Sequence, residues 1–263
     1  MKTIVRPTLL VLIAVFALVM APWATSAEEA VQSPTADVEH DGSDDYDPWH
    51  RFNEKMFFFN HDILDRYLVK PVATGWSKVL PDCGKRGLDR VFDNLGMPKR
   101  LVNNLLQGRF RGAGRELARF GVNTTVGVVG FLDVAHAQLH IEKSDADAGQ
   151  TLGVYGFGPG PYLVLPTLRP LTVRDGIGYG VDGVLDPFGY VTPFVATTAM
   201  SIVKQVNERA LNLEVFQDVE GSVLDLYSAV RNGYLQRRQR SIEEADAARQ
   251  AEWHPPLQAV AQR

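Results

Sequence analysis

Apolar side chains along most of this chain recur at the spacing of helices. The clearest example is the segment of residues 48–69, where apolar positions separated by three or four residues fall on one face of a helix. These positions are Trp49, Phe52, Met56, Phe59, Ile63 and Tyr67. Asp47 followed by Pro48 is typical of an N-cap and a proline at the first helical position. The pattern therefore predicts a helix over residues 48–69.

Similar patterns, interrupted by glycine and proline, predict further helices along the chain. Their predicted ranges are 71–80, 84–94, 98–106, 114–122, 195–216 and 222–247. Residues 248–263, which contain two consecutive prolines, are expected to form a frayed tail. The sequence thus predicts an all-α fold.

Two features of this pattern are unusual for a water-soluble protein. Residues 56–59 are apolar around a full helical turn, so that other helices must bury this turn or it must meet lipid. Three stretches, 120–132, 148–168 and 187–203, contain no charged residue and are broken by glycine or proline. They are too short or too interrupted to span a bilayer. They fit either ordinary core segments with turns, or irregular backbone that dips into a bilayer while lining a protein cavity.

The first residues have the order of an export signal. Lys2 and Arg6 precede an apolar run over residues 9–21, and small residues at 25–27 provide a cleavage site. The alternative is an uncleaved anchor helix, but the run is shorter than the ~20 residues of a typical span. We therefore expect residues 1–27 to be a signal peptide and the protein to function outside the cytoplasm. No cysteine ends this segment, so acylation there is not expected.

Charge is distributed unevenly along the chain, whose formal net charge is −4. Residues 28–48 contain eight acidic side chains and no lysine or arginine, and we expect residues 28–45 to be an acidic disordered tether. Residues 78–119 contain ten basic side chains against four acidic ones. Such a run is either a solvated helix face or a surface for anionic lipid headgroups. Nucleic acid is not an expected partner, because an exported chain without a recognition module gives no reason for one.

No catalytic constellation accompanies these features. The glycine-rich residues 153–160 include Pro159, which prevents the segment from opening a helix as a phosphate-binding loop does. Cys83, the only cysteine, lacks a nucleophile signature and is expected to be structural. We therefore expect no enzymatic activity and no cofactor.

Several histidines of the chain are candidate metal ligands. Two sets are conceivable, one of His136, His140 and Glu142 and the other of His50 and His61. Neither set has a recognised ligand spacing, and isolated histidines are more often surface or core residues. The sequence therefore predicts no metal site.

Several spaced strings together resemble one family. Its opening signature, D-P-x-x-x-F-N followed by M and N, is matched at residues 47–60. The densest match lies at residues 151–175, which include T-L-G-V-Y-G, G-P-Y and V-R-D. Shorter matches lie at residues 64–65, 69–73, 103–108, 119–124 and 130–135. Over residues 46–191 the chain resembles the MlaA (VacJ) family, the outer-membrane component of a bacterial phospholipid transport system.

The resemblance implies a ring-shaped, multi-helix domain with Gly/Pro-broken hairpin segments, here residues 46–247, embedded in one leaflet of the outer membrane. An amphipathic channel through the ring would take misplaced phospholipids from the outer leaflet to a soluble periplasmic carrier of the MlaC type. Family members also associate with trimeric porins, so a porin trimer is an expected partner. Well-known members are acylated on a cysteine after the signal, a position that Ala27 and Glu28 occupy here.

Three groups of residues are candidates for a role in such transport. Expected to contact the membrane are Phe57, Phe58 and Phe59. Expected to line the channel are Tyr155, Phe157 and Tyr162. A flexible apolar gate, bent at its glycines, is expected from Val126, Gly127, Val128, Val129, Gly130, Phe131 and Leu132.

Two other functions remain open from the residues alone. In the first, the chain is a soluble periplasmic module that binds a lipid or small molecule, and the phenylalanines fill a closed core. In the second, it is a structural partner of porins without a transport role. The need for detergent during fractionation separates an embedded ring from a soluble module.

Overall fold

A computed structural model describes residues 47–186, 190 and 192–253 of the chain. The chain divides into two units, Met1–Asp45 and Tyr46–Arg263, and the described residues belong to the second. The predicted signal peptide and acidic tether lie outside the described residues, as do residues 254–263 of the predicted tail.

One side of the second unit is a continuous helical wall. It consists of α2 (His50–Phe58), η2 (Phe59–Val69) and α3 (Lys70–Val79). α2 begins at His50, two residues after the predicted start. Before it, Asp47 Oδ1 accepts a hydrogen bond from the backbone N–H of Trp49 (3.1 Å). Pro71 lies in the first turn of α3, where its missing N–H is tolerated, so that the wall continues through it. The middle third, η2, is wound as a π-helix.

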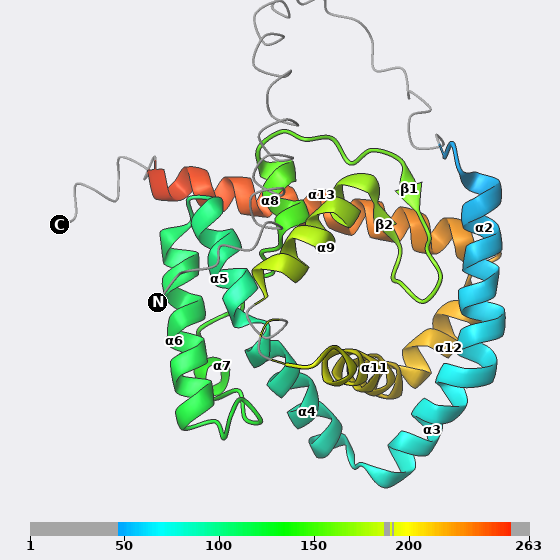
Figure 1. Cartoon of the computed structure of the whole chain (residues 1–263), viewed down its shortest axis with the longest axis horizontal. Helices are drawn as coiled ribbons and strands as arrows, with labels where there is room; N and C mark the ends of the chain where they lie inside the picture. Colours follow the sequence, from blue (N-terminus) through cyan, green and yellow to red (C-terminus); the bar gives the residue numbers. More distant parts are fainter. Residues whose placement is uncertain (1–46, 187–189, 191, 254–263) are drawn as a thin grey trace, which may run out of the picture. The chain divides into compact units, whose positions relative to one another are not determined.

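The remaining helices follow around a ring, with α13 lying across one side of it (Figure 1). After the wall the chain forms α4 (Asp82–Leu95), α5 (Met97–Leu106), α6 (Phe110–Thr125), α7 (Val134–Leu139), α8 (Ala148–Val154), α9 (Val173–Leu185), α11 (Phe194–Leu211), α12 (Leu213–Ser222) and α13 (Leu226–Trp253). α11 packs on α3 and α4, and α13 packs on α8. The all-α, ring-shaped fold is therefore confirmed.

The middle of the chain differs in detail from the prediction. The charge-free stretch 148–168 contains α8 and the strand β1 (Tyr162–Leu163), which pairs antiparallel with β2 (Leu171–Thr172). The helix predicted over residues 195–216 is divided at Asn212, whose φ of −117° and ψ of 24° are not helical. The helix α8 is short and capped by Asp147, which explains why periodicity did not predict it.

Two glycines allow α8 and α9 to approach each other closely. A Cβ placed on Gly178 would lie 2.2 Å from the backbone nitrogen of Gly149, a distance that no side chain can occupy. Each glycine thus provides the space that the other helix backbone needs. α8 and α9 form one of the two most extensive helix pairs of the described residues.

Polar side chains occupy much of the interior of this unit, while large apolar ones lie on its surface. Among the described residues, the largest fully buried side chains include Gln107, Glu116, Asn53, Asn103, Asn104 and Asn207. Exposed apolar side chains include Phe58, Tyr67, Val79, Phe110, Tyr179 and Val195. Within the described ranges, no helix has the length and hydropathy of a membrane span. The distribution is the reverse of the one that water imposes on a globular domain.

Candidate functional site

The predicted gate is an exposed turn that follows α6. Residues 126–132, called the apolar turn below, connect α6 to α7. Val126 is 65% exposed, Val128 64% and Val129 56%. Phe131 is the best-anchored apolar side chain of the turn, because its ring lies so close to Gly87 of α4 that a Cβ there would be 2.3 Å from it. The valines of the turn thus point outward, while the Phe131 side chain packs the turn against α4.

The backbone of the apolar turn has an uncommon conformation. Val128 and Val129 have φ angles of 54° and 58°, in the left-handed region that β-branched residues rarely adopt. Gly130 continues this conformation with a φ of 93°. The N–H of Gly130 donates to the carbonyl of Asn123 (2.7 Å), and that of Leu132 donates to the carbonyl of Gly127 (2.8 Å). Backbone hydrogen bonds therefore hold two strained valines in place.

A layer of polar side chains lies beneath this turn. Asn123 accepts a hydrogen bond from the N–H of Ala135 (2.9 Å) through Oδ1 and donates through Nδ2 to Asp133 (3.0 Å). Arg119 donates to the other oxygen of Asp133 (2.8 Å). Burial alone would raise the pKa of Asp133, but the hydrogen bonds from Arg119 and Asn123 outweigh it and hold the pKa below its ordinary value. The base of the apolar turn is thus fixed by an ionised carboxylate between an amide and a guanidinium.

The three phenylalanines of the wall point in different directions. Phe57 packs its ring edge-on against Tyr227 of α13, with centroids 5.7 Å apart, and is partly buried. Phe58 is 56% exposed and Phe59 37% exposed. The structure therefore leaves Phe58 and Phe59 available for membrane contact and places Phe57 against α13.

The three predicted channel residues are not gathered at one place. Tyr162 is 2% exposed and lies between Tyr227 and Tyr234, with ring centroids 6.1 and 6.0 Å away. Tyr155 is exposed and its hydroxyl donates to the carbonyl of Leu106. Phe157 is half-buried. Tyr162 is thus packed in the interior, while a channel-lining role for the three residues stays a prediction.

Two asparagines of the wall hold the segment around β1. Asn53 donates to the carbonyl of Tyr162 (2.9 Å) and accepts from the N–H of Val164 (2.9 Å). Further along the wall, Asn60 donates to the carbonyl of Leu165 (2.8 Å) and accepts from the N–H of Thr167. Both belong to the motif singled out in the sequence, although their role as backbone clasps was not predicted.

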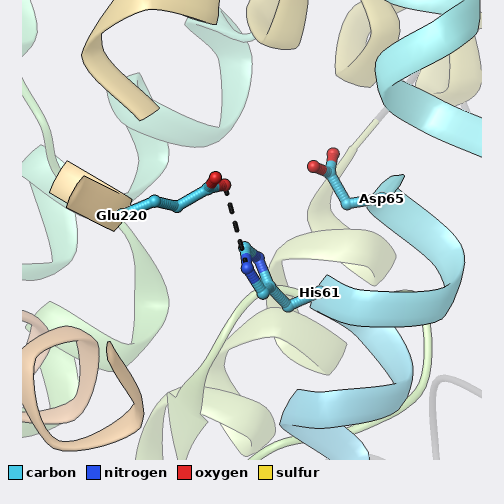
Figure 2. Close-up of side chains that lie close together, drawn as sticks. All are labelled: His61, Asp65 and Glu220. Carbon is cyan, nitrogen blue, oxygen red and sulfur yellow. Dashed lines mark ion pairs between the residues drawn. The ribbon is translucent and has the colours of Figure 1, made fainter. Parts of the chain in front are cut away.

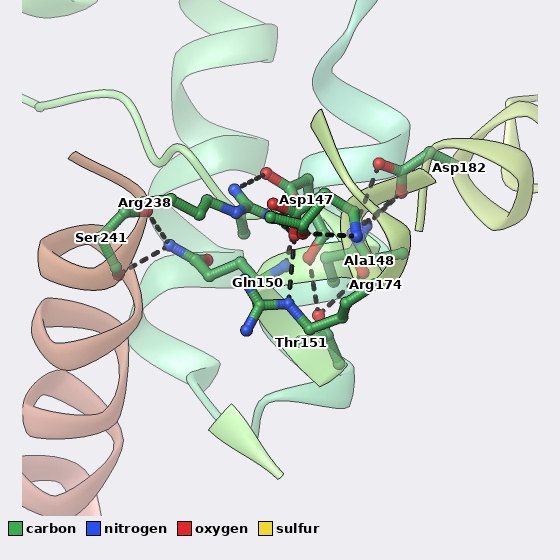
Figure 3. A network of polar contacts seen from close by, with 12 residues as sticks. Asp147, Ala148, Gln150, Thr151, Arg174, Asp182, Arg238 and Ser241 are labelled. Carbon is green, nitrogen blue, oxygen red and sulfur yellow. Dashed lines mark hydrogen bonds and ion pairs between the residues drawn. The ribbon is translucent and has the colours of Figure 1, made fainter. Parts of the chain in front are cut away.

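A second polar cluster joins α8, α9 and α13, and we call it the Arg238 junction (Figure 3). Arg238 donates to both oxygens of Asp147 (2.6 Å each) and to Oδ1 of Asp175 (2.9 Å). Burial would raise the pKa of Asp175, but Tyr234 and the two arginines Arg174 and Arg238 lower it further than burial raises it. One guanidinium thus links the first turns of α8 and α9 to the last long helix.

The junction continues into a set of buried amides. Asn103 donates to Asp182 (2.8 Å), whose carboxylate also accepts from the N–H of Ala148 (3.2 Å). Thr151 donates to the amide oxygen of Asn103 (2.9 Å). Burial raises the pKa of Asp182 despite these bonds. Asn103 and Thr151 belong to strings that carry the family resemblance, but their buried contacts were not predicted. Polar residues on otherwise apolar helical faces were the signal that could have revealed this set.

A helical ring with amide and ionic contacts inside and large apolar side chains outside belongs to a class of proteins built to lie in an apolar environment. The model of the MlaA lipoprotein family matches residues 45–241, and the chain belongs to this family.

Named relatives and a solved structure agree with this membership. The chain is 35% identical to the intermembrane phospholipid transport system lipoprotein MlaA of Escherichia coli, over 73% of this chain and 76% of that protein. The MlaA lipoprotein of Haemophilus influenzae is 32% identical, over 73% and 78% of the two chains. A chain solved in a study of the structural basis for maintenance of bacterial outer membrane lipid asymmetry is 32% identical, with a TM-score of 0.67, over 75% of this chain and 99% of its own.

Proposed function

We propose that this chain transports phospholipid at the outer membrane, removing mislocalised phospholipids from the outer leaflet and so maintaining lipid asymmetry. The observation that supports this most strongly is the reversed polarity of the helical ring. Exposed side chains such as Phe58 and Val79 suit contact with acyl chains, whereas the buried amides suit a polar interior. Two relatives named for phospholipid transport support the same function.

The physical demand on such a protein is to shelter both ends of an amphiphile. Each CH₂ of an acyl chain left in water costs about 0.8 kcal/mol, so that the tails must remain in an apolar environment while the headgroup moves through a polar one. This path requires no covalent step. We therefore propose a passive conduit and not an enzyme.

Partners and anchoring follow from the same proposal. The conduit would deliver lipid to a soluble periplasmic carrier and would sit beside a porin trimer, as the family resemblance implies. The relatives are named lipoproteins, but the single cysteine here is Cys83, in the first turn of α4. We propose that exposed apolar side chains of the ring, Phe58 and Phe59 among them, hold this chain at the membrane.

The decisive test measures outer-leaflet phospholipid in a bacterium that lacks its own family member, with and without this chain. We expect the wild-type chain to restore asymmetry, and Val129→Asp to fail, because a carboxylate on the apolar turn would have to enter an apolar environment. The matched control is Gln138→Asp, a new charge at an exposed polar position of α7. Protein levels of the wild type and both variants are compared by immunoblot.

Two outcomes would contradict the proposal. If wild-type chain accumulates in the outer-membrane fraction and phospholipid stays in the outer leaflet, transport is excluded for that partner set, and co-purification with porin then favours a structural role. If the chain is recovered without detergent, it is a soluble module. Equal activity of Val129→Asp and wild type would remove the apolar turn from the mechanism.

A further inference from the structure

Outside the apolar turn and the Arg238 junction, three potential metal ligands converge between the wall and α12. His61 and Asp65 extend from η2, and Glu220 extends toward them from α12 (Figure 2). One ligand atom from each side chain lies within 4.8 Å of the other two. His61 Nε2 and Glu220 Oε1 are 3.8 Å apart. From the sequence, His61 was grouped with His50 instead, because Glu220 is distant in the chain.

The helical register of the wall produces this convergence. In a π-helix, hydrogen bonds join residues i and i+5, so that positions four and five residues apart lie on one face. His61 and Asp65 lie within the π-helical η2, and both face α12. Such π-helical turns occur frequently at functional sites.

The ligand set suits a divalent transition-metal ion. One imidazole and two carboxylates are ligands that Zn²⁺ accepts, with bonds of about 2.0–2.2 Å that place tetrahedral ligands roughly 3.4 Å apart. The three side chains are 19–31% exposed, so that rotation of the Glu220 side chain can bring them to this spacing. They line a pocket of about 330 Å³, which leaves room for water on the remaining positions.

Asp65 is already oriented as a ligating carboxylate would be. Arg209 donates to both of its oxygens, through Nε and Nη2, at 2.8 Å each. A carboxylate can accept about four hydrogen bonds or ligand bonds, so that one lone pair per oxygen stays open. Carboxylates that bind metals are themselves commonly hydrogen-bonded by an outer partner, and Arg209 fits that role.

Charges around the pocket set the strength of binding. Arg66 and Lys70 line the pocket together with Asp62, and Arg209 lies behind Asp65. These cations oppose a divalent ion, whereas Asp62 and Glu220 favour it. We therefore expect moderate affinity, set by the balance of these charges.

α12 is the element that such an ion would hold. None of its described residues is buried, and Val215, Phe216 and Val219 are all exposed. Arg209 lies over the ring of Phe216, 4.2 Å from its centroid, at one end of the helix. The His61–Glu220 pair lies near the other end. A metal bridge at Glu220 would therefore hold this end of α12 to the wall.

We propose that His61, Asp65 and Glu220 form a Zn²⁺-class metal site that clasps α12 to the wall. This site is independent of the proposed transport function. It predicts that the ion, and not burial, determines how firmly residues 213–222 are held.

The test uses the full chain in detergent, freed of metal with a chelator and titrated with ZnCl₂ by calorimetry. We expect one saturable site, and a loss of affinity of at least about tenfold in His61→Phe and in Glu220→Gln. His61→Phe keeps the stacking on Phe57, whose ring centroid lies 5.7 Å away, so that the fold is preserved while the ligand is removed. Circular dichroism without metal verifies that both variants fold as wild type.

The matched control is a histidine–carboxylate pair that no third potential ligand joins among the described residues. His136 Nε2 lies 3.2 Å from Glu142 Oε1, and both side chains are more than half exposed. His136→Phe should leave Zn²⁺ affinity unchanged. If it lowers affinity as much as His61→Phe does, the binding is adventitious and the proposed site is wrong.

Hydrogen exchange of the same samples tests the clasp itself. Zn²⁺ should slow amide exchange over residues 213–222 in wild type and not in Glu220→Gln. Absence of saturable binding, or binding that leaves exchange in α12 unchanged, would overturn the proposal.

Discussion

Polar side chains stabilise both the apolar turn and the Arg238 junction. The two differ in how exposed they are and in how far apart in sequence the residues lie that they connect. The apolar turn exposes valines, and its polar base involves residues between 94 and 135. The Arg238 junction joins residues from 147, 175 and 238, and its arginine is 15% exposed. The apolar turn is a local structure at the surface, whereas the Arg238 junction links helices that are distant in sequence.

The difference indicates where the ring can change shape. Opening the apolar turn breaks a few hydrogen bonds among neighbouring residues and releases the strain at Val128 and Val129. Opening the Arg238 junction would separate three helices and deprive Asp147 and Asp175 of the guanidinium that they share. Local rearrangement should therefore occur at the turn, while the junction keeps the ring assembled.

The largest expected effect comes from removing the cation of the junction. Arg238→Leu leaves Asp147 and Asp175 without their shared partner, and we expect the free energy of unfolding to fall by about 3–5 kcal/mol. Chemical denaturation in detergent, followed by circular dichroism, measures it. Arg237→Leu removes an exposed arginine from the adjacent position and should change stability little. Equal losses in the two variants would mean that the junction is not a special source of stability.

A smaller and more local effect is expected at the base of the turn. Asn123→Ala removes the acceptor for the N–H of Ala135 and one donor to Asp133, and we expect a loss of about 1–3 kcal/mol. Hydrogen exchange should accelerate over residues 126–135 and not at the Arg238 junction. Thr125→Ala is the control, since its exposed hydroxyl bonds only within α6 (2.7 Å to the carbonyl of Gly121). Uniform acceleration across the ring would show that the turn is not an independent unit.

Much of the fold could be predicted from periodicity because most helices of the ring have one apolar face. α4, α5 and α6 were predicted to within a few residues at most of their ends, α6 beginning four residues before its predicted start. α8 and α9 were not, because glycines such as Gly149 and Gly178 leave few apolar positions to count. Their N-cap residues, Asp147 and Thr172, indicate where the two helices begin, but hydrophobic periodicity does not take caps into account.

The candidate site was predictable only in part, because side-chain direction depends on distant packing. The sequence predicted membrane contact for Phe57, Phe58 and Phe59 alike, but the ring of Phe57 packs against Tyr227 of α13. Tyr162 was predicted to line a channel, and two tyrosines of α13 pack against its ring. The exposed valines of the apolar turn, by contrast, lie in a stretch that the absence of charge had already marked. Local composition identified the segment, and long-range contacts decided which residues face outward.

The smallest effect tests the strain that distinguishes the apolar turn from the junction. Val126 and Val128 are almost equally exposed, at 65% and 64%, but φ is −85° at Val126 and 54° at Val128. Glycine relieves the left-handed conformation, which costs a β-branched residue about 1–2 kcal/mol, and it adds roughly 0.5–1 kcal/mol of backbone entropy to the unfolded chain. Val128→Gly should therefore raise the free energy of unfolding slightly, whereas Val126→Gly should lower it, as denaturant midpoints can measure. If both substitutions destabilise the chain equally, the valine at 128 is not strained, and backbone strain does not distinguish the apolar turn from the Arg238 junction.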